Sequence, residues 1–600
     1  MRNAPGTTIE MRAGDWDRAG VRLVDLPGTY SLLAKTPDEQ VTTDALAGLH
    51  GGSPDVAVVL LDAAALPRSL YLLGQVAQTG TPVVAALTMC DVARSRSVTV
   101  DAARLERALG VPVVALDPRE GTDGLADAVA HAAVHPAQVA GVVPAGPTTL
   151  RPEREAQLAR SEALFAWVDE VRRELGHTTE HVERSGSDRI DRVLLHPWVG
   201  VPVFAVLMWG LFQLSTTVAA PLMGWAGALV GGPLSAAARV VLGWFGLAGT
   251  PLEGLVVDGV IAGVGTVVSF APLMALMFLA IAILDDSGYL ARAAFVADRA
   301  MRSIGLDGRA ILPIIVGFGC NVPALAATRA LPDARQRTIA AILVPYTSCA
   351  ARLTVYILLG AVFFPRNAGT VIFAMYVASI ALVVLTGLVM RRFSGAGANT
   401  EPLLMVLPAY QRPRLGALLV STWVRTRGFV VGAGRIIVAT LTIIWLLMAI
   451  PVAGDHRIGD VPVRDSLYGA TAEAIAPVFA PAGFDSWQAT AALMTGFVAK
   501  EVVVGSFAQS LAVDEPDDPA RSADLGEHLR GTFEQSSGGH GAAAALAFMV
   551  FVLAYTPCLA TVAEQKRLLG WRTTLAAMGA QLVLAWVLAV LVFQGFRLVL

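Results

Sequence analysis

The sequence predicts a soluble α/β domain followed by a polytopic α-helical membrane domain, and three observations support this fold class. Of the 600 residues, 55% are hydrophobic and 16% are charged, and the mean hydropathy is +0.59, whereas a soluble protein carries about 25% charged residues. Long apolar runs begin only after Trp198. Before Trp198, short apolar runs alternate with helical patterns, which is typical of a parallel sheet covered on both faces.

The bulk composition also excludes several classes of protein. A net charge of −3 gives no reason to expect a nucleic-acid partner. The four cysteines include no C-x-x-C pair, so they do not indicate a disulfide scaffold. Residues 1–20 are polar and lack the apolar segment of a signal peptide.

Four apolar runs in the N-terminal part predict buried parallel strands: Val21–Val24, Val56–Leu61, Pro82–Leu87 and Val111–Leu116. Helical stretches lie between them, for example 69–79 and 102–109. Ligands of such sheets bind at the carboxyl ends of the strands, and these ends carry Asp25, Asp62, Asp91 and Asp117. A single Asp at such a place more often caps the following helix. The four Asp residues together, one after each predicted strand, favour a nucleotide site.

Two short motifs refine the soluble part to a P-loop-GTPase-like domain. Asp25-Leu26-Pro27-Gly28 has the D-x-x-G form, in which the Asp holds Mg²⁺ through water and the Gly amide meets the terminal phosphate of GTP. Asp91 follows a strand at the place of the Asp that reads guanine. No G-x-x-x-x-G-K-[ST] phosphate loop occurs in the 600 residues. We therefore expect residues 1–147 to form an incomplete domain without its first strand and phosphate loop, and the chain to bind GTP weakly or not at all. We also expect the reading frame upstream to encode the loop.

Residues 148–190 are expected to form a helical region between the two domains. Within Pro152–Gly176 the apolar residues recur at helical spacing, at Leu158, Leu164, Trp167, Val168 and Val171. Sequence alone leaves open whether this helix is regulatory or a simple amphipathic connector.

Residues 191–600 are expected to form the membrane domain, because a spanning helix needs about 20 apolar residues. Candidate spans are 198–218, 255–284, 338–364, 369–390, 429–451, 489–511 and 575–597. Two further segments, 311–328 and 542–563, are interrupted by Gly, Pro and polar residues. Gate-like motifs are therefore expected near 311–364 and 542–563.

Basic residues predict which side of the membrane each loop faces. Arg184, Arg189 and Arg192 precede the first span and place the soluble domain in the cytoplasm. Arginines flank the 311–328 segment on both sides, so this segment should enter the membrane and return. The less basic loop 453–487 should face outward, and the topology beyond Glu501 stays open.

A short internal repeat indicates two gate-like halves. Tyr346-Thr347-Ser348-Cys349-Ala350-Ala351 and Tyr555-Thr556-Pro557-Cys558-Leu559-Ala560 share the pattern Y-T-x-C-x-A. Matching interrupted segments in two halves indicate the binding site of a transporter. Interrupted backbone at membrane depth is tolerated only inside protein or beside a water-filled cavity.

Three of the four cysteines lie at these interruptions, namely Cys320, Cys349 and Cys558, with Asn321 beside the first. A lone cysteine is usually a small apolar packing residue. Their shared placement favours a pathway for a soft divalent metal through transient contacts. Lys500 and Glu501 lie inside the apolar run 491–511, where they either neutralise each other or, in the case of Glu501, line the pathway. Glu253 and Asp258 are expected at the membrane interface.

Together these segments resemble one family, the bacterial ferrous-iron transporter FeoB. The resemblance rests on long segments that begin at Asn3, Asp25, Leu87, Asp191, Asp285, Gly317, Ser348, Ala499 and Pro557: "NAPGTTIE", "DLPGTYSL", "LTMCD", "DRVLLHPWVG", "DDSGYLARAAFVADR", "GFGCNVPALAATR", "SCAARL", "AKEVVVG" and "PCLAT". It implies Thr8 as the Mg²⁺-sensing threonine. Thr88 replaces the Asn of the family's N-M-x-D guanine reader.

The resemblance further implies an importer of Fe²⁺ in the cell inner membrane, with a cytoplasmic domain that binds GTP and Mg²⁺. It also implies small cytoplasmic accessory proteins and a possible homo-oligomer. Two alternatives stay open: a transporter of another divalent metal or solute, and a membrane-anchored regulatory GTPase without transport.

Overall fold

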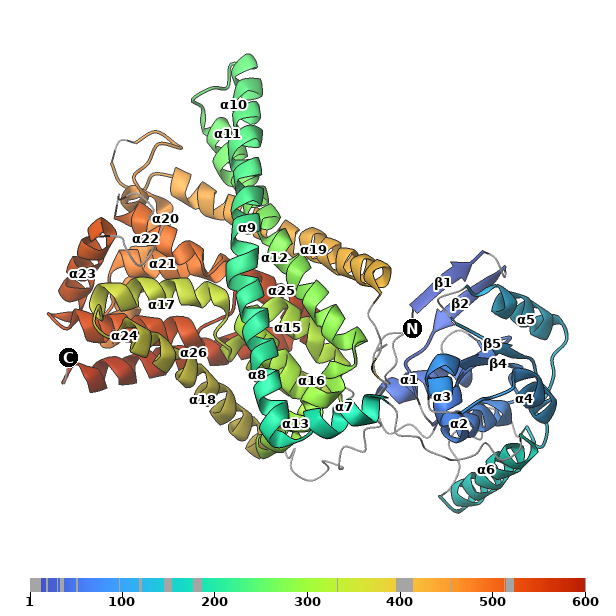
Figure 1. The fold of residues 1–600 in the computed structure, drawn as a ribbon. Coiled ribbons are helices and arrows are strands. Elements are labelled where there is room, and N and C mark those ends of the chain that lie inside the picture. Colours follow the sequence, from blue (N-terminus) through green and yellow to red (C-terminus); the bar gives the residue numbers. More distant parts are fainter. Residues whose placement is uncertain are drawn as a thin grey trace. The chain divides into compact units, whose positions relative to one another are not determined.

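The computed structural model describes residues 12–17, 20–29, 31–32, 37–49, 52–95, 98–117, 121–144, 154–175, 186–331, 333–394, 410, 414–454, 456–511, 513 and 523–598. The chain divides into two compact units (Figure 1). The first comprises Met1–His196 with the short stretches Arg329–Ala334 and Val406–Tyr410, and the second comprises the remainder. We call them the soluble unit and the membrane unit.

The soluble unit contains a three-stranded parallel sheet in the order β3-β4-β5. Its strands are β3 (Ala57–Asp62), β4 (Val83–Thr88) and β5 (Val113–Ala115). Its helices are α1 (Pro37–Leu46), α2 (Leu66–Gln78), α3 (Cys90–Ser95), α4 (Ala102–Leu109) and α5 (Asp123–Val134). The sequence predicted the three strands and the helices α2 and α4, whereas α1, α3 and α5 were not predicted. In β4 the side chains of Val83–Leu87 are buried on both faces.

Two features differ from the expected sheet. Val21–Asp25 forms β2, but β2 pairs antiparallel with β1 (Arg12–Trp16) in a hairpin and has no partner in the parallel sheet among the described residues. Leu23 and Val24 of β2 are 49% and 42% exposed, so the expectation of a buried strand was wrong. The short pattern V-R-L-V fits a two-stranded ribbon as well as a buried strand, and only the partner strand decides between them.

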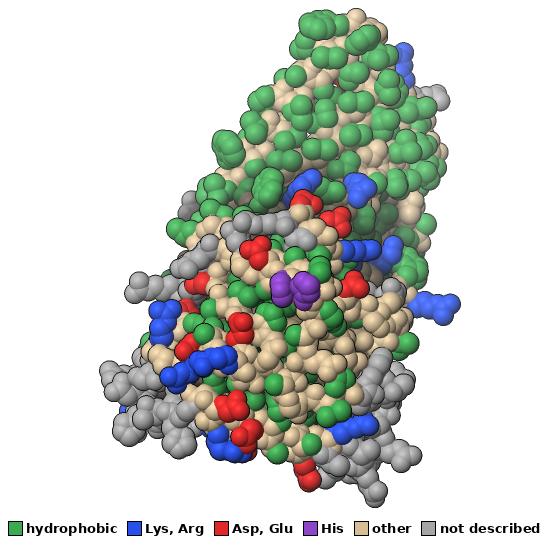
Figure 2. Space-filling model, turned by 90° about the vertical axis from the view of Figure 1, so that its right-hand side faces the viewer, with side chains coloured by type: hydrophobic (Ala, Val, Ile, Leu, Met, Phe, Trp, Pro, Cys, Tyr) green, Lys and Arg blue, Asp and Glu red, His purple; other side chains and the backbone are tan. Residues whose placement is uncertain are grey.

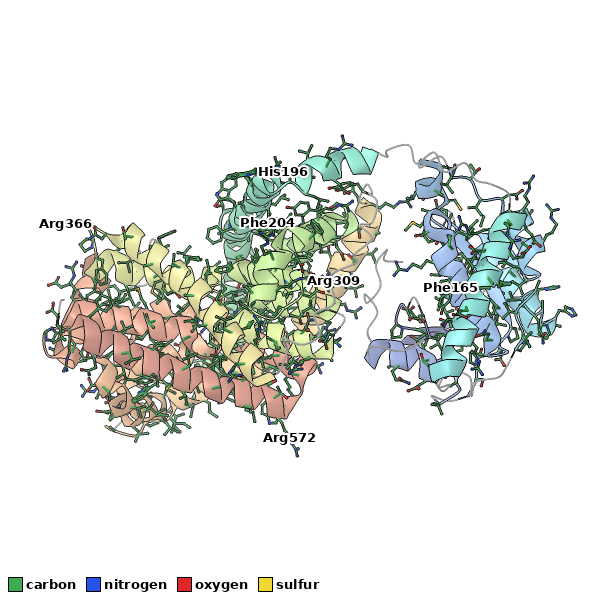
Figure 3. All side chains as sticks on the ribbon, turned by 90° about the horizontal axis from the view of Figure 1, so that it is seen from below. Phe165, His196, Phe204, Arg309, Arg366 and Arg572 are labelled. Atoms are coloured by element: carbon green, nitrogen blue, oxygen red, sulfur yellow. The ribbon has the colours of Figure 1, made fainter. Side chains whose placement is uncertain are left out.

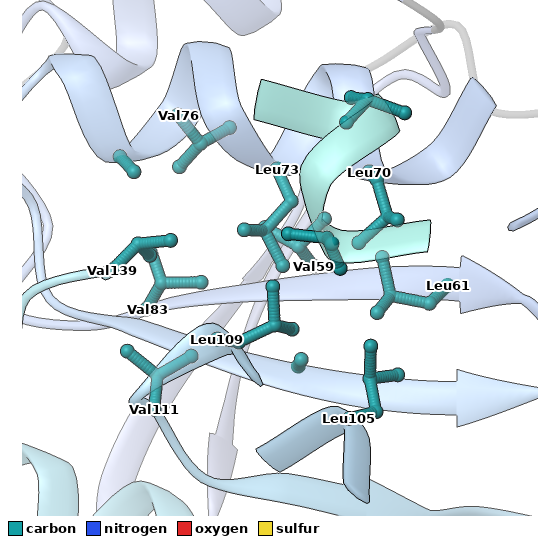
Figure 4. Packing of buried hydrophobic residues seen from close by; sticks show 14 of the residues in the cluster. Val59, Leu61, Leu70, Leu73, Val76, Val83, Leu105, Leu109, Val111 and Val139 are labelled. Atoms are coloured by element: carbon teal, nitrogen blue, oxygen red, sulfur yellow. The ribbon is translucent and has the colours of Figure 1, made fainter. Parts of the chain in front are cut away.

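The helix α6 (Arg154–Glu174) belongs to the core of the soluble unit. Its Leu164, Trp167, Val168 and Val171 lie in the same buried cluster as the apolar residues of α2 and of the sheet (Figure 4). The indole Nε1 of Trp167 donates a hydrogen bond of 2.8 Å to the carbonyl oxygen of Ala140. Phe165 of α6 (Figure 3) is 59% exposed and stacks on the ring of Tyr71 of α2, with the ring centres 4.8 Å apart. The amphipathic spacing was therefore read correctly, and the apolar face covers α2.

The membrane unit begins with a long helical path that contains two π-helical segments. Its parts follow without interruption as α8 (Pro197–Gln213), η3 (Leu214–Val218), α9 (Ala219–Leu229), η4 (Val230–Leu234) and α10 (Ser235–Trp244). Pro233 lies inside η4, and a proline, which lacks an N–H, favours such a local widening. A helical hairpin returns through α11 (Pro251–Gly254), η5 (Leu255–Ile261) and α12 (Ala262–Asp286).

Two sets of elements follow. The first contains α13 (Tyr289–Ser303), α14 (Ile311–Gly319), α15 (Asn321–Ala327), α16 (Ala334–Leu343), η8 (Val344–Tyr346), α17 (Ala350–Phe363) and α18 (Ala368–Ser394). The second contains α19 (Leu415–Ala449), α20 (Leu467–Ile475), α21 (Trp487–Val498), α22 (Val502–Ser510), α23 (Ala523–Ser537), α24 (Gly541–Ala554), α25 (Leu559–Leu569) and α26 (Trp571–Phe596).

Seven helical stretches of the described residues are long and apolar enough to cross a membrane. They are Ala219–Trp244, Pro251–Asp286, Ala334–Phe363, Ala368–Arg392, Leu415–Ala449, Gly541–Leu569 and Trp571–Phe596. Hydrophobic side chains cover the projecting helical hairpin, whereas charged side chains gather on the soluble unit (Figure 2). The prediction of a membrane domain with many helices is confirmed.

The expected spans differ from these stretches in two places. The run 198–218 is helical and begins the longer path, and the stretch Ala219–Trp244 of the same path is also long and apolar enough to cross a membrane; it was not predicted because glycines and prolines interrupt it. The run 489–511 is divided at residues 499–501 into α21 and α22, which pack against each other. The buried polar pair Lys500-Glu501 falls in this interruption.

Candidate functional site

Four interrupted helices form the centre of the membrane unit. The interruptions fall at Cys320, at 347–349, at 499–501 and at 555–558. Contacts between α15 and α25, and between α17 and α24, join the two halves. Gln565 on α25 also donates a hydrogen bond of 3.2 Å to the carbonyl oxygen of Ala341 on α16. Interrupted helices leave backbone carbonyl and amide groups without helical partners, which makes these positions suitable for binding.

The first interruption is a single extended residue between two short helices. Cys320 has φ −155° and ψ 132°, and α14 and α15 on its two sides pack against each other. The buried Asn321 accepts a hydrogen bond of 3.1 Å at Oδ1 from the hydroxyl of Thr347. Gly317 lies so close to Thr347 that a Cβ there would collide with the threonine hydroxyl. This glycine allows the first two interruptions to meet.

The second interruption is held by a buried arginine. Arg352 on α17 is fully buried and donates hydrogen bonds to the carbonyl oxygens of Thr347, at 2.6 Å, and Pro345, at 2.9 Å. From α18, Ser379 accepts from the amide of Ser348 and donates to the carbonyl of Tyr346. These contacts satisfy the carbonyl groups at the end of η8. Cys349 is the residue directly before α17. Sequence analysis missed Arg352, although it is the single charged residue between Arg337 and Arg366.

The third and fourth interruptions meet through Lys500. Its side chain is 1% exposed, and its Nζ donates a hydrogen bond of 2.9 Å to the carbonyl oxygen of Thr556. The same Nζ lies 3.5 Å from the centre of the Tyr555 ring, within the range of a cation–π contact. The structure records no ion pair between Lys500 and Glu501, and the buried Oε1 of Glu501 has no hydrogen-bond partner there. The two residues were expected to neutralise each other, but they form no direct ion pair.

Two of the three thiols of the membrane unit lie in one region. Cys320 and Cys558 pack against the same apolar cluster. The Cys558 thiol is 3.0 Å from the hydroxyl oxygen of Thr561. All four cysteines of the chain are free and partly accessible.

These groups do not form a metal cage. Among the described residues, no three His, Cys, Asp or Glu side chains lie close enough together to hold a metal ion. A cavity of about 340 Å³ beside the first interruption is apolar, with Phe212, Met277, Phe318 and Tyr376 in its wall, and none of the thiols lines it. The convergence of the three thiols on one cavity therefore stays a prediction.

Glu253 and Asp258, which were expected at the interface, lie near the hairpin end of the α10–α12 region. The guanidinium of Arg239 lies 3.9 Å from the Glu253 carboxylate and 3.6 Å from that of Asp258. These exposed pairs neutralise charge at the end of an apolar hairpin.

In the soluble unit the carboxyl edge of the sheet gathers part of the predicted nucleotide site. Asp62 and Thr88 end neighbouring strands in register, and the Thr88 hydroxyl donates a hydrogen bond of 3.1 Å to the carbonyl of Leu61. Asp62 accepts from the amide of Ala64 and caps the following turn, so for this residue the capping reading is correct. Asp91 lies in the first turn of α3 and is exposed.

The residue between Thr88 and α3 has an unusual backbone. Met89 has φ 59°, the left-handed region that non-glycine residues rarely adopt. The next residue, Cys90, lies near enough to the carboxylates of Asp91 and Asp117, which follow β4 and β5, for both to act on its thiol. Burial and these carboxylates raise the pKa of the Cys90 thiol above its ordinary value. Strained backbone of this kind is often found at functional sites.

The D-x-x-G loop lies on the hairpin and is tied to the helices. Asp25 and Gly28 are exposed, whereas Pro27 is buried and its carbonyl accepts a hydrogen bond of 2.8 Å from Thr42 of α1. The amide of Leu32 donates to Gln75 of α2 at 2.8 Å. No hydrogen bond of the described residues joins Asp25 or Gly28 to Thr88 or Asp91. Thr8 lies outside the described residues.

Comparison with known proteins identifies the family of the whole chain. A family model described as ferrous iron transport protein B matches residues 1–129, and a model of its C terminus matches residues 372–425. The curated "Fe(2+) transporter FeoB" of Staphylococcus aureus (strain COL) is 30% identical over 99% of this chain and 95% of its own length. The protein of the same name from Legionella pneumophila (strain Paris) is 30% identical over 99% of this chain and 90% of its own length.

The chain belongs to the FeoB family. A third model, Gate, described as nucleoside recognition, matches two stretches of this FeoB chain, 267–363 and 430–572. These stretches contain the first and second pairs of interruptions, so the two halves that the short repeat predicted are matched by the same model.

The soluble part is also similar to solved structures. The FeoB G-domain of Methanococcus jannaschii is 34% identical and covers 22% of this chain and 85% of its own, with a TM-score of 0.19. The NFeoB structure from S. thermophilus, bound to GDP·AlF4⁻ and K⁺, is 26% identical and covers 32% of this chain and 81% of its own, with a TM-score of 0.22. At these TM-scores the likeness adds nothing to the family assignment.

Proposed function

We propose that this protein carries Fe²⁺ across the cell inner membrane through the interrupted helices of its membrane unit, and that the cytoplasmic soluble unit gates this pathway by binding GTP. The observation that supports this most is the meeting of four helix interruptions, three of them bearing thiols, in a chain that aligns with Fe²⁺ transporters over 99% of its length. Soft sulfur and amide ligands suit Fe²⁺ better than Mg²⁺ or Ca²⁺.

The proposed pathway consists of Cys320, Asn321, Cys349, Cys558 and Glu501. Fe²⁺ lies low in the order of divalent affinities, so a tight thiolate cage would favour Zn²⁺ or Cu²⁺ instead. Separate contacts, each weak enough to release the ion, suit transport.

For GTP the described residues fit one end of the nucleotide. Thr88, Asp91 and Asp117 at the carboxyl edge of the sheet fit a guanine base, whose N1 and N2 groups donate to a carboxylate such as that of Asp91. For the phosphates and Mg²⁺ the described residues offer Asp25 and Gly28, and Thr8 would sense the metal. When bound, GTP supplies the charged phosphates whose presence or loss can reorder a switch loop. Accessory cytoplasmic proteins and a homo-oligomer are further parts of the proposal.

The cysteines provide the decisive experiment. The full-length protein is placed in liposomes, and Fe²⁺ uptake is measured without oxygen for Cys320→Ser, Cys349→Ser, Cys558→Ser and the corresponding Ala variants. Losing one soft ligand should lower uptake roughly tenfold, which corresponds to about 1.4 kcal/mol. Val420→Ser, at an exposed position of α19, is the control and should retain uptake.

The outcomes separate the alternatives. Wild-type uptake by the triple Cys→Ala variant would reject the ligand role of the thiols. Preferred uptake of Mn²⁺, Zn²⁺ or a nucleoside would favour another solute, and a wild-type protein without any uptake would favour a regulatory GTPase.

A further inference from the structure

The two halves of the membrane unit repeat their helix interruptions. Cys320 and Ala499 are both extended, with φ −155° and ψ 132° in the first and φ −150° and ψ 119° in the second. The repeated Y-T-x-C-x-A pattern also places a cysteine directly before a helix in each half, Cys349 before α17 and Cys558 before α25. Residues at the same distance after these two cysteines therefore occupy equivalent positions on α17 and α25.

One face of these two helices is polar and buried in both halves. The residues three and seven positions after the cysteine are Arg352 and Tyr356 in α17, and Thr561 and Gln565 in α25. All four side chains are fully buried. Residues four positions apart lie one above the other on a helix, so each pair forms a continuous stripe, which we call the polar face of α17 and the polar face of α25.

The polar face of α17 is closed to a cation. Arg352 carries a permanent positive charge, and its guanidinium already occupies the carbonyl oxygens of Thr347 and Pro345. The hydroxyl oxygen of Tyr356 accepts a hydrogen bond of 3.5 Å from Ser348. A divalent ion would be repelled here, because the protein interior screens charge poorly.

The polar face of α25 offers neutral oxygen atoms instead. The Thr561 hydroxyl oxygen lies 3.0 Å from the Cys558 thiol, so this face starts at a proposed ligand. One turn further, the Nε2 of Gln565 donates to the carbonyl oxygen of Ala341, which fixes the amide because only its NH₂ group can donate. The Oε1 of Gln565 is buried and has no hydrogen-bond partner among the described residues. Leaving such an acceptor unsatisfied is costly, and a cation would satisfy it.

The polar face of α25 also has a direction. The last turn of α25 carries Lys566 and Arg567, and basic residues mark the cytoplasmic end of a membrane helix. Thr561 and Gln565 therefore lie on the cytoplasmic side of the interruption at 555–558.

We propose that the polar face of α25 forms the cytoplasmic part of the Fe²⁺ pathway, with the Thr561 hydroxyl and the Gln565 Oε1 as successive oxygen ligands beyond Cys558. This inference rests on the proposed function and adds two ligands to it. Neutral oxygen atoms that hold the ion weakly suit its release into the cytoplasm. If the polar face of α25 only packed the two halves together, its side chains would meet neither water nor metal.

Cysteine substitution tests this inference without a transport measurement. Gln565→Cys is made in the full-length protein, which is treated without oxygen with a small cationic methanethiosulfonate, and mass spectrometry locates the modified residue. A thiol reacts only where the reagent reaches it, so position 565 should react at least about tenfold faster than Ala545→Cys, which is equally buried in α24. Fe²⁺ should slow the reaction at position 565, because the ion competes for the same place.

Fe²⁺ uptake into liposomes is the second measurement. Thr561→Val removes the hydroxyl at nearly constant shape and should lower uptake roughly tenfold, which is the loss of one ligand. Thr354→Val is the matched control on α17. Thr354 lies off the polar face and its hydroxyl donates to the carbonyl of Ala351 in its own helix, so this variant should retain uptake.

The two measurements have separate ways to fail. A Gln565→Cys thiol that reacts no faster than Ala545→Cys, or that Fe²⁺ does not protect, would overturn the proposal, as would wild-type uptake by Thr561→Val. If Gln565→Cys does not fold, Thr561→Val decides. A wild-type protein that takes up no Fe²⁺ contradicts the proposed function instead.

Discussion

At the scale of single residues, the polar groups buried in the membrane unit hold its interrupted helices together. Arg352 and Lys500 each donate a hydrogen bond to the carbonyl oxygen of a threonine that lies in a helix interruption. Burying a charge is costly unless it is well paired. Such residues are therefore expected to serve a purpose, and the sequence pattern alone identified Lys500 but passed over Arg352.

The thiol of Cys90 offers a prediction with a pH dependence. Burial and the carboxylates of Asp91 and Asp117 raise its pKa, while Arg94 opposes this shift. Because only the thiolate reacts, alkylation of Cys90 by iodoacetamide should be slow at pH 7.5 and should accelerate at a pH above the ordinary thiol pKa. The rate is followed by mass spectrometry of the Cys90 peptide in the full-length protein.

Two variants test the cause of this slow reaction. Asp117→Asn removes one negative charge and should shift the alkylation profile to lower pH. Arg107→Cys, on the exposed face of α4, supplies a reference thiol. Equal rates for Cys90 and this reference would contradict the prediction.

At the scale of elements, glycine determines how closely the interrupted helices can approach. Gly317 on α14 has the Thr347 hydroxyl beside it, whereas Gly428 inside α19 has open space. An added methyl group improves helix propensity by up to about 1 kcal/mol in both helices, but overpacking costs about 1–3 kcal/mol. The free-energy cost of the collision should exceed the gain in helix propensity only at Gly317.

We therefore expect Gly317→Ala to lower the unfolding temperature of the detergent-solubilised protein and to reduce Fe²⁺ uptake. Gly428→Ala is the matched control and should be neutral or slightly stabilising. A Gly317→Ala protein with wild-type stability and uptake would show that the close packing of α14 on Thr347 is dispensable.

The elements also show where sequence patterns suffice. Helix α4 begins and ends at the expected residues, because Asp101 caps its first turn and Gly110 ends it with a positive φ. Strand β1 was not expected, since Arg12–Trp16 carries little apolar pattern and its conformation depends on pairing with β2. The division of 489–511 depends on contacts between Lys500 and Thr556, which lie 56 residues apart in the sequence.

At the scale of the whole molecule, hydropathy and repeats predicted a soluble part, a membrane part and two halves, and the family assignment agrees with all three. The candidate site was predictable as far as its interruptions and thiols, because Gly, Pro and Cys mark them in the sequence. The contacts within the site were not predictable, because hydrogen bonds such as that from Gln565 to Ala341 join residues from different halves.

Membrane topology gives a prediction at the same scale. Arg366, between α17 and α18, and Arg572, at the start of α26, lie at opposite ends of the helical bundle (Figure 3). Basic residues on both sides of 311–328 indicate that this segment returns to the cytoplasmic side, and the packing of α14 against α15 suits such a hairpin. Cysteines placed at exposed positions 303 and 335 should react with an impermeant maleimide from the cytoplasmic side.

The matched variant Arg366→Cys should react from the outside. All three are made in a protein whose four native cysteines are replaced by alanine, and they are labelled in sealed right-side-out and inverted vesicles. Opposite labelling of positions 303 and 335 would mean that the 311–328 segment crosses the membrane.

The difference between Asn321 and Lys500 has a consequence for how such a protein can arise. A transporter assembled from two identical subunits would carry the same residue at both positions, and any mutation would change both at once. Encoding the two halves in one gene removes this constraint, since each copy can then accumulate its own substitutions. Because this chain carries both halves in one reading frame, the positions that follow the two extended residues Cys320 and Ala499 can differ, as Asn321 and Lys500 do.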